Sequence, residues 1–203
     1  MAQLSMFNQA RTAKDVVFTS DEVAQDIIGY FNPSGIVLDP CKGEGSFFRQ
    51  FPAGVTALYC EIAEGKDFFN FNQKVNWIIG NPPYSIFYDF LKHSFKLAND
   101  IVYIVPTNKV FQSWKLMKEI QKFGGIRSML VYGSGHLVGF PFGFSVGAFH
   151  FRKGYKGEVD LQLRTPPNNR LQPTWGTDAA KEFLSQPEGL PAFGSSRNPP
   201  PSG

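Results

Sequence analysis

The sequence has few cysteines and histidines and no long apolar segment. Its 203 residues include two cysteines, Cys41 and Cys60, and three scattered histidines. This set offers neither a disulfide framework nor a metal-ligand spacing, so we expect a reducing, cytoplasmic setting and no metal. No apolar run reaches the length of a membrane span, and the first residues lack the apolar core of a signal peptide. We therefore expect no membrane association.

The charge balance is nearly even, which excludes little. Twenty Lys and Arg residues oppose 17 Asp and Glu, giving a net charge of +3. This mildly basic balance permits a polyanionic partner such as nucleic acid without requiring one. Phenylalanine occurs 21 times, which indicates either a ring-packed core or exposed stacking surfaces.

Strand-like and helix-like segments alternate up to about residue 135. The pattern predicts strands at 36–38, 55–60, 77–79, 101–105, 126–132 and 145–152, and helices at 22–31, 47–50, 87–98 and 110–123. Such a rhythm predicts an α/β domain of three layers, with a mostly parallel seven-stranded sheet that ends in an antiparallel hairpin. We expect a catalytic domain at 1–164. We expect a disordered, proline-rich tail at 165–203, apart from a weak helix at 178–184.

A glycine-rich loop at 39–47, Asp-Pro-Cys-Lys-Gly-Glu-Gly-Ser-Phe, follows the first strand. Its glycines allow a ligand to approach the backbone closely, and Glu61 at the end of the next strand can accept both hydroxyls of a ribose. The carboxylates of Asp39 and Glu44 would repel a pyrophosphate but suit an ammonium group. The loop thus favours S-adenosylmethionine over a dinucleotide, and a plain glycine turn is the remaining interpretation.

The segment Asn81-Pro82-Pro83-Tyr84 directly follows an apolar strand. A residue before a proline is kept out of the helical region, and two prolines in series stiffen the chain. We interpret the segment as a rigid holder for something flat and polar.

Together, the loop at 39–47 and the segment at 81–84 resemble motifs of the amino-methylating, adenine-specific DNA methyltransferases. A segment like 17–20 precedes both motifs in one subgroup, and the resemblance covers about residues 15–152. It implies a Rossmann-like fold and S-adenosylmethionine as cofactor. It also implies methyl transfer to the 6-amino group of adenine in DNA, since Asn at the first motif position favours adenine over cytosine.

The resemblance also implies a set of cofactor-binding residues. They are Phe18, Thr19 and Ser20 for the methionine end; Asp39, with the backbone of Pro40, Gly43 and Gly45, for the ammonium group; Glu61 for the ribose; and Ile62, Asp67 and Phe68 for the adenine. For Phe68 and its neighbours Phe69 and Phe71, core packing is an equal alternative.

In the catalytic motif, the Asn81 side-chain oxygen and the Pro82 carbonyl would accept the two amine hydrogens. Because Pro82 and Pro83 fix these acceptors in place, no general base or metal is needed. Tyr84 would stack on the base, a contact worth roughly 1–3 kcal/mol, and the base must be flipped out or unpaired. In the turn at 140–144, Phe142 would be a second stacking ring; core packing and a hairpin lid are its alternatives.

The sequence is compatible with more than one substrate and partner. The same Asn-Pro-Pro-Tyr segment occurs in enzymes that methylate ribosomal RNA bases or a release-factor glutamine, and a non-catalytic nucleic-acid-binding subunit is a further alternative. Among the lysines, Lys42 and Lys109 could contact phosphates, whereas Lys115, Lys118 and Lys122 have the spacing of a solvated helix face. No separate target-recognition region is evident, so a specificity subunit or a homodimer could supply one. A bacterial, plasmid or phage origin would suit this family.

Overall fold

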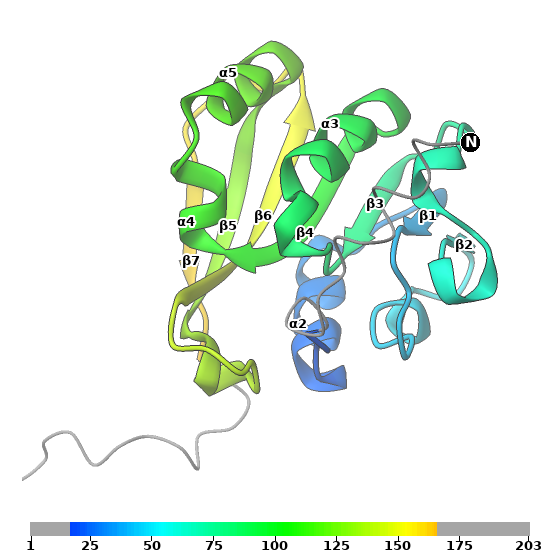
Figure 1. Ribbon diagram of the computed structural model, residues 1–203, viewed down its shortest axis with the longest axis horizontal. Helices are drawn as coiled ribbons and strands as arrows, with labels where there is room; N and C mark the ends of the chain where they lie inside the picture. The colour runs from blue at the N-terminus through cyan, green and yellow to red at the C-terminus, as the bar shows by residue number, and fades with distance from the viewer. Residues whose placement is uncertain (1–16, 166–203) are drawn as a thin grey trace, which may run out of the picture. The chain divides into compact units, whose positions relative to one another are not determined.

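A computed structural model describes residues 17–165 as one seven-stranded sheet with helices on both faces (Figure 1). Its strands are β1 (Ile36–Asp39), β2 (Thr56–Tyr59), β3 (Trp77–Gly80), β4 (Asp100–Pro106), β5 (Gly124–Ser134), β6 (Ser145–Lys153) and β7 (Asp160–Leu163). The spatial order is β2-β1-β3-β4-β6-β5-β7. β2, β1, β3 and β4 are parallel, and β6 is antiparallel to both β4 and β5. The predicted mostly parallel sheet with an antiparallel hairpin is therefore confirmed, but the sheet does not end in that hairpin, because β7 adds a further parallel strand at its edge.

Six of the seven strands lie where the sequence pattern places them, and the seventh, β7, was not located by it. β7 pairs in parallel with β5 at the sheet edge, outside the hairpin. Its four residues, Asp-Leu-Gln-Leu, are mostly exposed, so they carry no buried apolar pattern from which a strand could be predicted. A hydrogen bond of 2.8 Å from the Tyr30 hydroxyl to Asp160 ties β7 to helix α2 (Asp21–Phe31).

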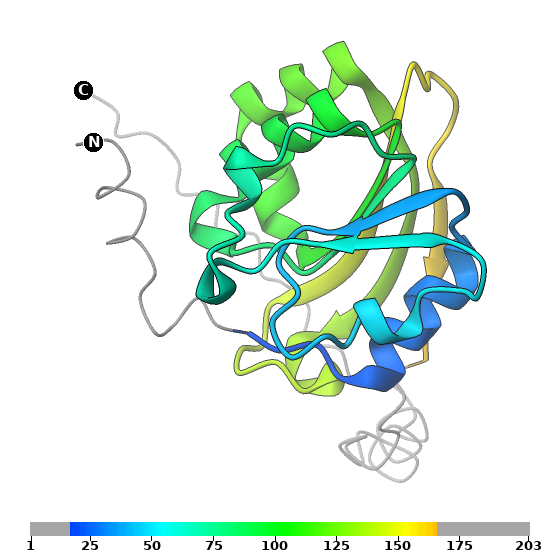
Figure 2. The same ribbon diagram turned by 90° about the vertical axis from the view of Figure 1, so that its right-hand side faces the viewer.

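The sheet separates two apolar layers. In β4, Ile101, Tyr103 and Val105 face one core cluster, and Val102 and Ile104 face the other. Helix α2 (Asp21–Phe31) covers the second cluster, and α3 (Phe87–Leu97), α4 (Thr107–Phe111) and α5 (Trp114–Phe123) cover the first (Figure 2). Because both faces of the central strands are buried, their sequences are continuously apolar rather than alternating.

Two predicted helices differ from those observed. The helix expected at 110–123 is divided into α4 and α5, because the Ser113 hydroxyl accepts a hydrogen bond from the Leu116 amide (3.3 Å) and starts a new helix there. The helix expected at 47–50 is a single 3₁₀ turn, Phe48–Gln50. The structure describes no residue beyond 165. The predicted tail from 166 onward, including its helix at 178–184, therefore lies outside the described residues.

The parallel strands determine where polar loops can gather. β1, β3 and β4 end at Asp39, Gly80 and Pro106, and each strand passes into a loop or helix at the same edge of the sheet. In open α/β sheets, ligands bind at the carboxyl ends of the strands. Within residues 17–165, no helix combines the length and apolar character needed to cross a membrane.

Candidate active site

A cleft of about 440 Å³ opens at the carboxyl ends of β1 to β3. This volume lies within the roughly 300–1,000 Å³ typical of small-molecule sites. Four parts of the chain line it: Val17, Phe18 and Thr19 before α2; Cys41, Lys42, Gly43, Glu44, Ser46 and Phe47 after β1; Glu61, Ala63 and Glu64 after β2; and Asn81 and Pro83 after β3. Segments far apart in the sequence therefore meet at one site.

The loop after β1 needs its glycines. Gly43 and Gly45 have φ angles of +52° and +87°, in the left-handed region that favours glycine. Gly80, at the end of β3, packs against the same loop, and a Cβ there would lie 3.0 Å from both Asp39 Oδ1 and Pro40 Cδ. Gly80 was not predicted as a site residue, although its position between an apolar strand and Asn81 could have suggested a close backbone approach.

Asp39 is the buried charge of the cleft region. Its side chain is 1% exposed; Oδ1 accepts a hydrogen bond from the Cys41 amide (3.2 Å), and Oδ2 is buried without a hydrogen-bond partner among residues 17–165. Burial raises the pKa of Asp39 to about 7, and the nearby Glu61 carboxylate adds to the increase. A buried carboxylate oxygen of this kind favours a bound cation, because pairing offsets its loss of hydration.

Glu61 holds the loops around the cleft. Its Oε2 accepts from the Gly43 amide (2.8 Å), and its Oε1 accepts from the Ala63 amide (3.1 Å). Each carboxylate oxygen retains a further lone pair for a ligand hydroxyl. Ile62, which was expected to pack on an adenine ring, is not among the lining residues, and Ala63 and Glu64 occupy that side.

Two residues expected near the adenine lie outside the cleft lining. Asp67 caps the 3₁₀ turn Phe68–Asn70 by accepting from the Phe69 amide (3.0 Å). Phe68 is 3% exposed, and its ring centroid lies 4.4 Å from that of Phe90. The structure thus places Phe68 in the core, which was the alternative interpretation, and leaves little of its ring accessible to a ligand.

The three residues that precede α2 have different surroundings. Phe18 is 52% exposed in the cleft, whereas Thr19 is buried. The Ser20 hydroxyl accepts from the Val23 amide (3.4 Å) and caps α2. Ser20 also lines a neighbouring hollow of about 400 Å³, so of the three expected cofactor contacts only Phe18 and Thr19 line the main cleft.

The Asn81 side chain uses its amide nitrogen within the protein and leaves its amide oxygen without a partner among the described residues. Its Nδ2 donates to the Val17 carbonyl (2.8 Å) and to the Thr19 hydroxyl (3.1 Å), whereas its Oδ1 is buried without a partner among the described residues. Its backbone carbonyl accepts from the Cys41 thiol (2.9 Å). Neither the Val17–Asn81 contact nor the Cys41 contact was predicted, because each joins residues at least 40 positions apart.

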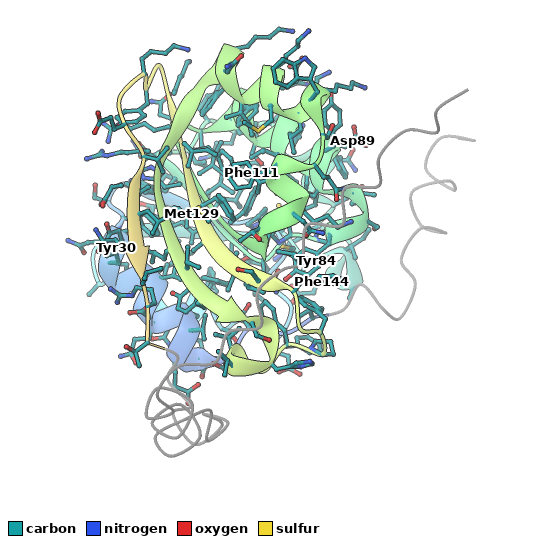
Figure 3. All side chains as sticks on the ribbon, turned by 90° about the vertical axis from the view of Figure 1, so that its left-hand side faces the viewer. Tyr30, Tyr84, Asp89, Phe111, Met129 and Phe144 are labelled. Atoms are coloured by element: carbon teal, nitrogen blue, oxygen red, sulfur yellow. The ribbon has the colours of Figure 1, made fainter. Side chains whose placement is uncertain are left out.

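The two predicted stacking rings come together although they are 58 positions apart in the sequence. Tyr84 and Phe142 have ring centroids 6.0 Å apart and planes at 75°. Tyr84 is 8% exposed, and burial raises the pKa of its phenol, whereas the neighbouring Asn81 side chain partly opposes this increase. No group within residues 17–165 meets full hydrogen-bond geometry with the phenol oxygen. Phe142 also contacts the exposed Phe144, which lies at the same end of the molecule as Tyr84 (Figure 3). Pro82 is buried, and Pro83 lines the cleft.

The Lys42 side chain is held by contacts within the protein. Its Nζ lies 2.7 Å from Glu64 Oε1 and 4.0 Å from the ring centroid of Tyr59. These contacts make it a poor candidate for a phosphate contact. Within the described part of the chain, no three His, Cys, Asp or Glu residues gather as a metal site would require.

No protein-family model and no curated protein sequence matches the chain. Solved structures are similar to it in fold. A Listeria monocytogenes protein described as a class I S-adenosylmethionine-dependent methyltransferase has a TM-score of 0.59 at 13% identity, covering 79% of this chain and 69% of that one. A type I restriction-modification methyltransferase subunit from Streptococcus thermophilus has a TM-score of 0.54 at 13% identity. The match covers 70% of this chain and only 45% of that subunit.

A Pyrococcus horikoshii protein described as an RNA methyltransferase is similar at a TM-score of 0.50 and 16% identity, covering 66% of this chain and 82% of that one. These likenesses show that the chain has the fold of class I S-adenosylmethionine-dependent methyltransferases. The predicted α/β, Rossmann-like arrangement of the sheet agrees with these likenesses.

Proposed function

We propose that the protein transfers a methyl group from S-adenosylmethionine to the 6-amino group of adenine in DNA. The observation that carries this proposal is the buried, unpartnered Oδ1 of Asn81, which directly follows β3 and borders the cleft. An unpartnered acceptor of this kind costs about 1–3 kcal/mol. An arriving amine hydrogen would remove that penalty. We propose residues 1–164 as the catalytic domain.

The cleft residues fit the cofactor. Asp39, Pro40 and Gly45 lie behind the residues that line the cleft, and Gly43 lines it. We propose that Asp39 holds the ammonium group through its unpartnered Oδ2, with the backbone of Pro40, Gly43 and Gly45 alongside. Glu61 would accept the ribose hydroxyls, and Phe18 would lie along the methionine end. Thr19, which is buried and hydrogen-bonded to Asn81, would not contact the cofactor through its hydroxyl. When bound, S-adenosylmethionine supplies an electrophilic methyl group. For the adenine end, Ala63 joins Ile62, Asp67 and Phe68 as a candidate, and it alone of these lines the cleft.

Asn81 and Pro82 would act on the substrate amine. An exocyclic amine is a weak nucleophile because its lone pair is delocalised into the base. By accepting both hydrogens, Asn81 Oδ1 and the Pro82 carbonyl would draw the nitrogen toward tetrahedral geometry and localise the lone pair. Two prolines hold these acceptors in place, so the site needs little reorganisation as charge develops. The methylated amine then releases one proton to solvent.

Tyr84 and Phe142 would hold the flipped base. A base stacked between two rings requires centroids about 7 Å apart, twice the roughly 3.5 Å of van der Waals contact. The observed separation is 6.0 Å, with the rings edge to face, so Phe142 must turn and move slightly outward when the base enters. Its loop at 139–144 follows a 3₁₀ turn and has two exposed glycines, so we expect such a shift to cost little free energy.

We propose that target recognition comes from a specificity subunit or from a second copy of the chain. This chain spans less than half of the restriction-modification subunit that it resembles. The remaining partner is DNA, with the target adenine flipped or single-stranded.

The substrate is tested by incubating the protein with tritiated S-adenosylmethionine and DNA from a host that lacks adenine methylation. Single-stranded and double-stranded DNA, ribosomal RNA and release factor are assayed in parallel, with Asn81→Ala as background. We expect label in DNA and 6-methyladenine in the digested nucleosides. Label in RNA or release factor alone would replace the DNA assignment. Cofactor binding without any transfer would indicate a non-catalytic binding subunit.

A further inference from the structure

The orientation of the Asn81 carboxamide decides whether the proposed chemistry is possible. The amide nitrogen and oxygen are nearly equal in size, so the group fits its surroundings in two orientations related by a half-turn. Only one of them presents an acceptor to an incoming amine. The hydrogen-bond partners of the carboxamide must select that orientation.

The segment Val17–Thr19 makes this selection. The Val17 carbonyl can only accept a hydrogen bond, so the atom 2.8 Å from it must be the amide nitrogen. In the reversed orientation, two oxygens would face each other at this distance. The Thr19 hydroxyl, 3.1 Å from Nδ2, accepts the second hydrogen. Both amide hydrogens are thus used, and Oδ1 is left as the acceptor.

Thr19 was expected to contact the methionine end of the cofactor. Its side chain is only 6% exposed, and its hydroxyl oxygen is hydrogen-bonded to Asn81. Its segment nevertheless borders the cofactor cleft, so one stretch of chain serves both ligands. We propose that Thr19 is a positioning residue, which together with the Val17 carbonyl orients Asn81 so that Oδ1 receives the substrate amine.

This inference rests on the proposed function, and a conservative pair of variants tests it. Thr19→Val keeps the shape of the side chain but removes the hydroxyl, whereas Thr19→Ser keeps the hydroxyl. We expect Thr19→Val to lower kcat by about tenfold, the value of one hydrogen bond, while the cofactor Kd stays within about twofold. Thr19→Ser should restore kcat to within about threefold. Thr56→Val, an exposed substitution on strand β2, is the matched control and should change neither value.

A second readout does not depend on activity. In ¹⁵N-labelled protein, the Asn81 side-chain amide is assigned by its loss in Asn81→Asp. We expect its two protons to exchange slowly with solvent in the wild type and at least tenfold faster in Thr19→Val. Thermal unfolding confirms that each variant is folded.

The outcomes separate the two proposals. Unchanged amide exchange in folded Thr19→Val overturns the positioning role, whatever the substrate is. Parallel losses of kcat and cofactor affinity also overturn it, because Thr19 would then be a cofactor contact. If the wild type methylates nothing but the amide exchange responds as expected, the proposed function fails and the positioning role stands.

Discussion

Buried polar side chains are hydrogen-bonded at one end of the sheet, whereas several at the other end keep an atom without a partner among the described residues. At the amino end of β4, His150 Nε2 donates to Asp100 Oδ1 (2.8 Å), and Ser128 Oγ lies 3.5 Å from His150 Nδ1. The indole of Trp77 stacks on the imidazole of His150, with ring centroids 5.3 Å apart. At the carboxyl end, by contrast, the side chains of Asp39, Asn81 and Tyr84 each keep a buried atom without a partner among the described residues.

This difference distinguishes structural polar groups from ligand-binding ones. A buried polar atom that is hydrogen-bonded stabilises the fold, whereas an unpartnered one costs free energy and needs another explanation. Three of the four unpartnered atoms found within residues 17–165 belong to the proposed site. The fourth, the hydroxyl of Tyr88, lies on α3 one helical turn beyond Tyr84.

A triad-like group at the amino end of β4 is not an active site. Ser128, His150 and Asp100 have the composition of a nucleophilic triad, but Ser128 and His150 are 5% and 3% exposed. The 3.5 Å separation of Ser128 and His150 is also long for activating a hydroxyl. No substrate carbonyl could reach this serine, so the group of three is structural.

The largest expected effect is that of Asn81→Ala. Losing a preorganised acceptor should lower methyl transfer by about 10²–10³-fold. Cofactor affinity should be retained, since Asp39 and Glu61 remain. Turnover is measured with labelled cofactor and affinity by calorimetry. Equal losses of binding and turnover would mean that Asn81 only supports the cleft.

Asp39 should make cofactor binding depend on pH. Its pKa of about 7 means that the carboxylate becomes protonated below neutrality, so affinity should fall about tenfold per pH unit below pH 7 and level off above pH 8. In Asp39→Asn, binding should be weaker by on the order of a hundredfold and independent of pH in this range. Calorimetry from pH 5.5 to 8.5 measures both. A pH-dependent affinity in the variant would assign the titration to another group.

The same carboxyl group should lower the stability of the ligand-free protein at high pH. The native state keeps a proton that the unfolded chain, with a carboxyl pKa near 3.8, has already released. This contribution to the unfolding free energy is therefore present below about pH 4 and is lost as pH rises to 7. The total is on the order of 4 kcal/mol. Urea unfolding of wild type and Asp39→Asn should diverge across this window, with the variant more stable at pH 8.

At the other end of the sheet, His150→Ala should affect stability and not binding. The substitution leaves Asp100 with one less partner and removes a buried ring, which should cost roughly 2–4 kcal/mol of unfolding free energy. Cofactor affinity, measured on the folded fraction, should be unchanged. An altered affinity would show that the two ends are energetically coupled, and the comparison would then fail.

Sequence patterns predicted the fold better than the details of the site. Buried strands such as Ile101–Val105 are apolar because both of their faces are covered, and this signal is local. The position of β7 was missed because an exposed edge strand has no such pattern. The partners of Asn81 lie 62 and 64 positions away, so neither motif could reveal that Val17 and Thr19 orient it. Phe68 was ambiguous for a different reason. A ring that follows an acidic residue in the sequence is equally consistent with a core position and with a ligand contact.

The smallest expected effect comes from a matched pair of tyrosines. The Ser94 hydroxyl donates to the Phe90 carbonyl (2.8 Å), so the Tyr103 hydroxyl must donate to Ser94 Oγ (2.7 Å). Tyr103→Phe should therefore cost about 1 kcal/mol of unfolding free energy. Tyr84→Phe removes a buried hydroxyl that has no partner and should change stability by less than about 0.5 kcal/mol, with no loss of turnover if only the ring face stacks on the base. Urea unfolding and DNA methylation rates measure both variants. Equal destabilisation would mean that the Tyr84 hydroxyl is bonded in solution. Lost turnover at unchanged stability would show that this hydroxyl contacts the substrate, making Tyr84 a hydrogen-bonding residue as well as a stacking one.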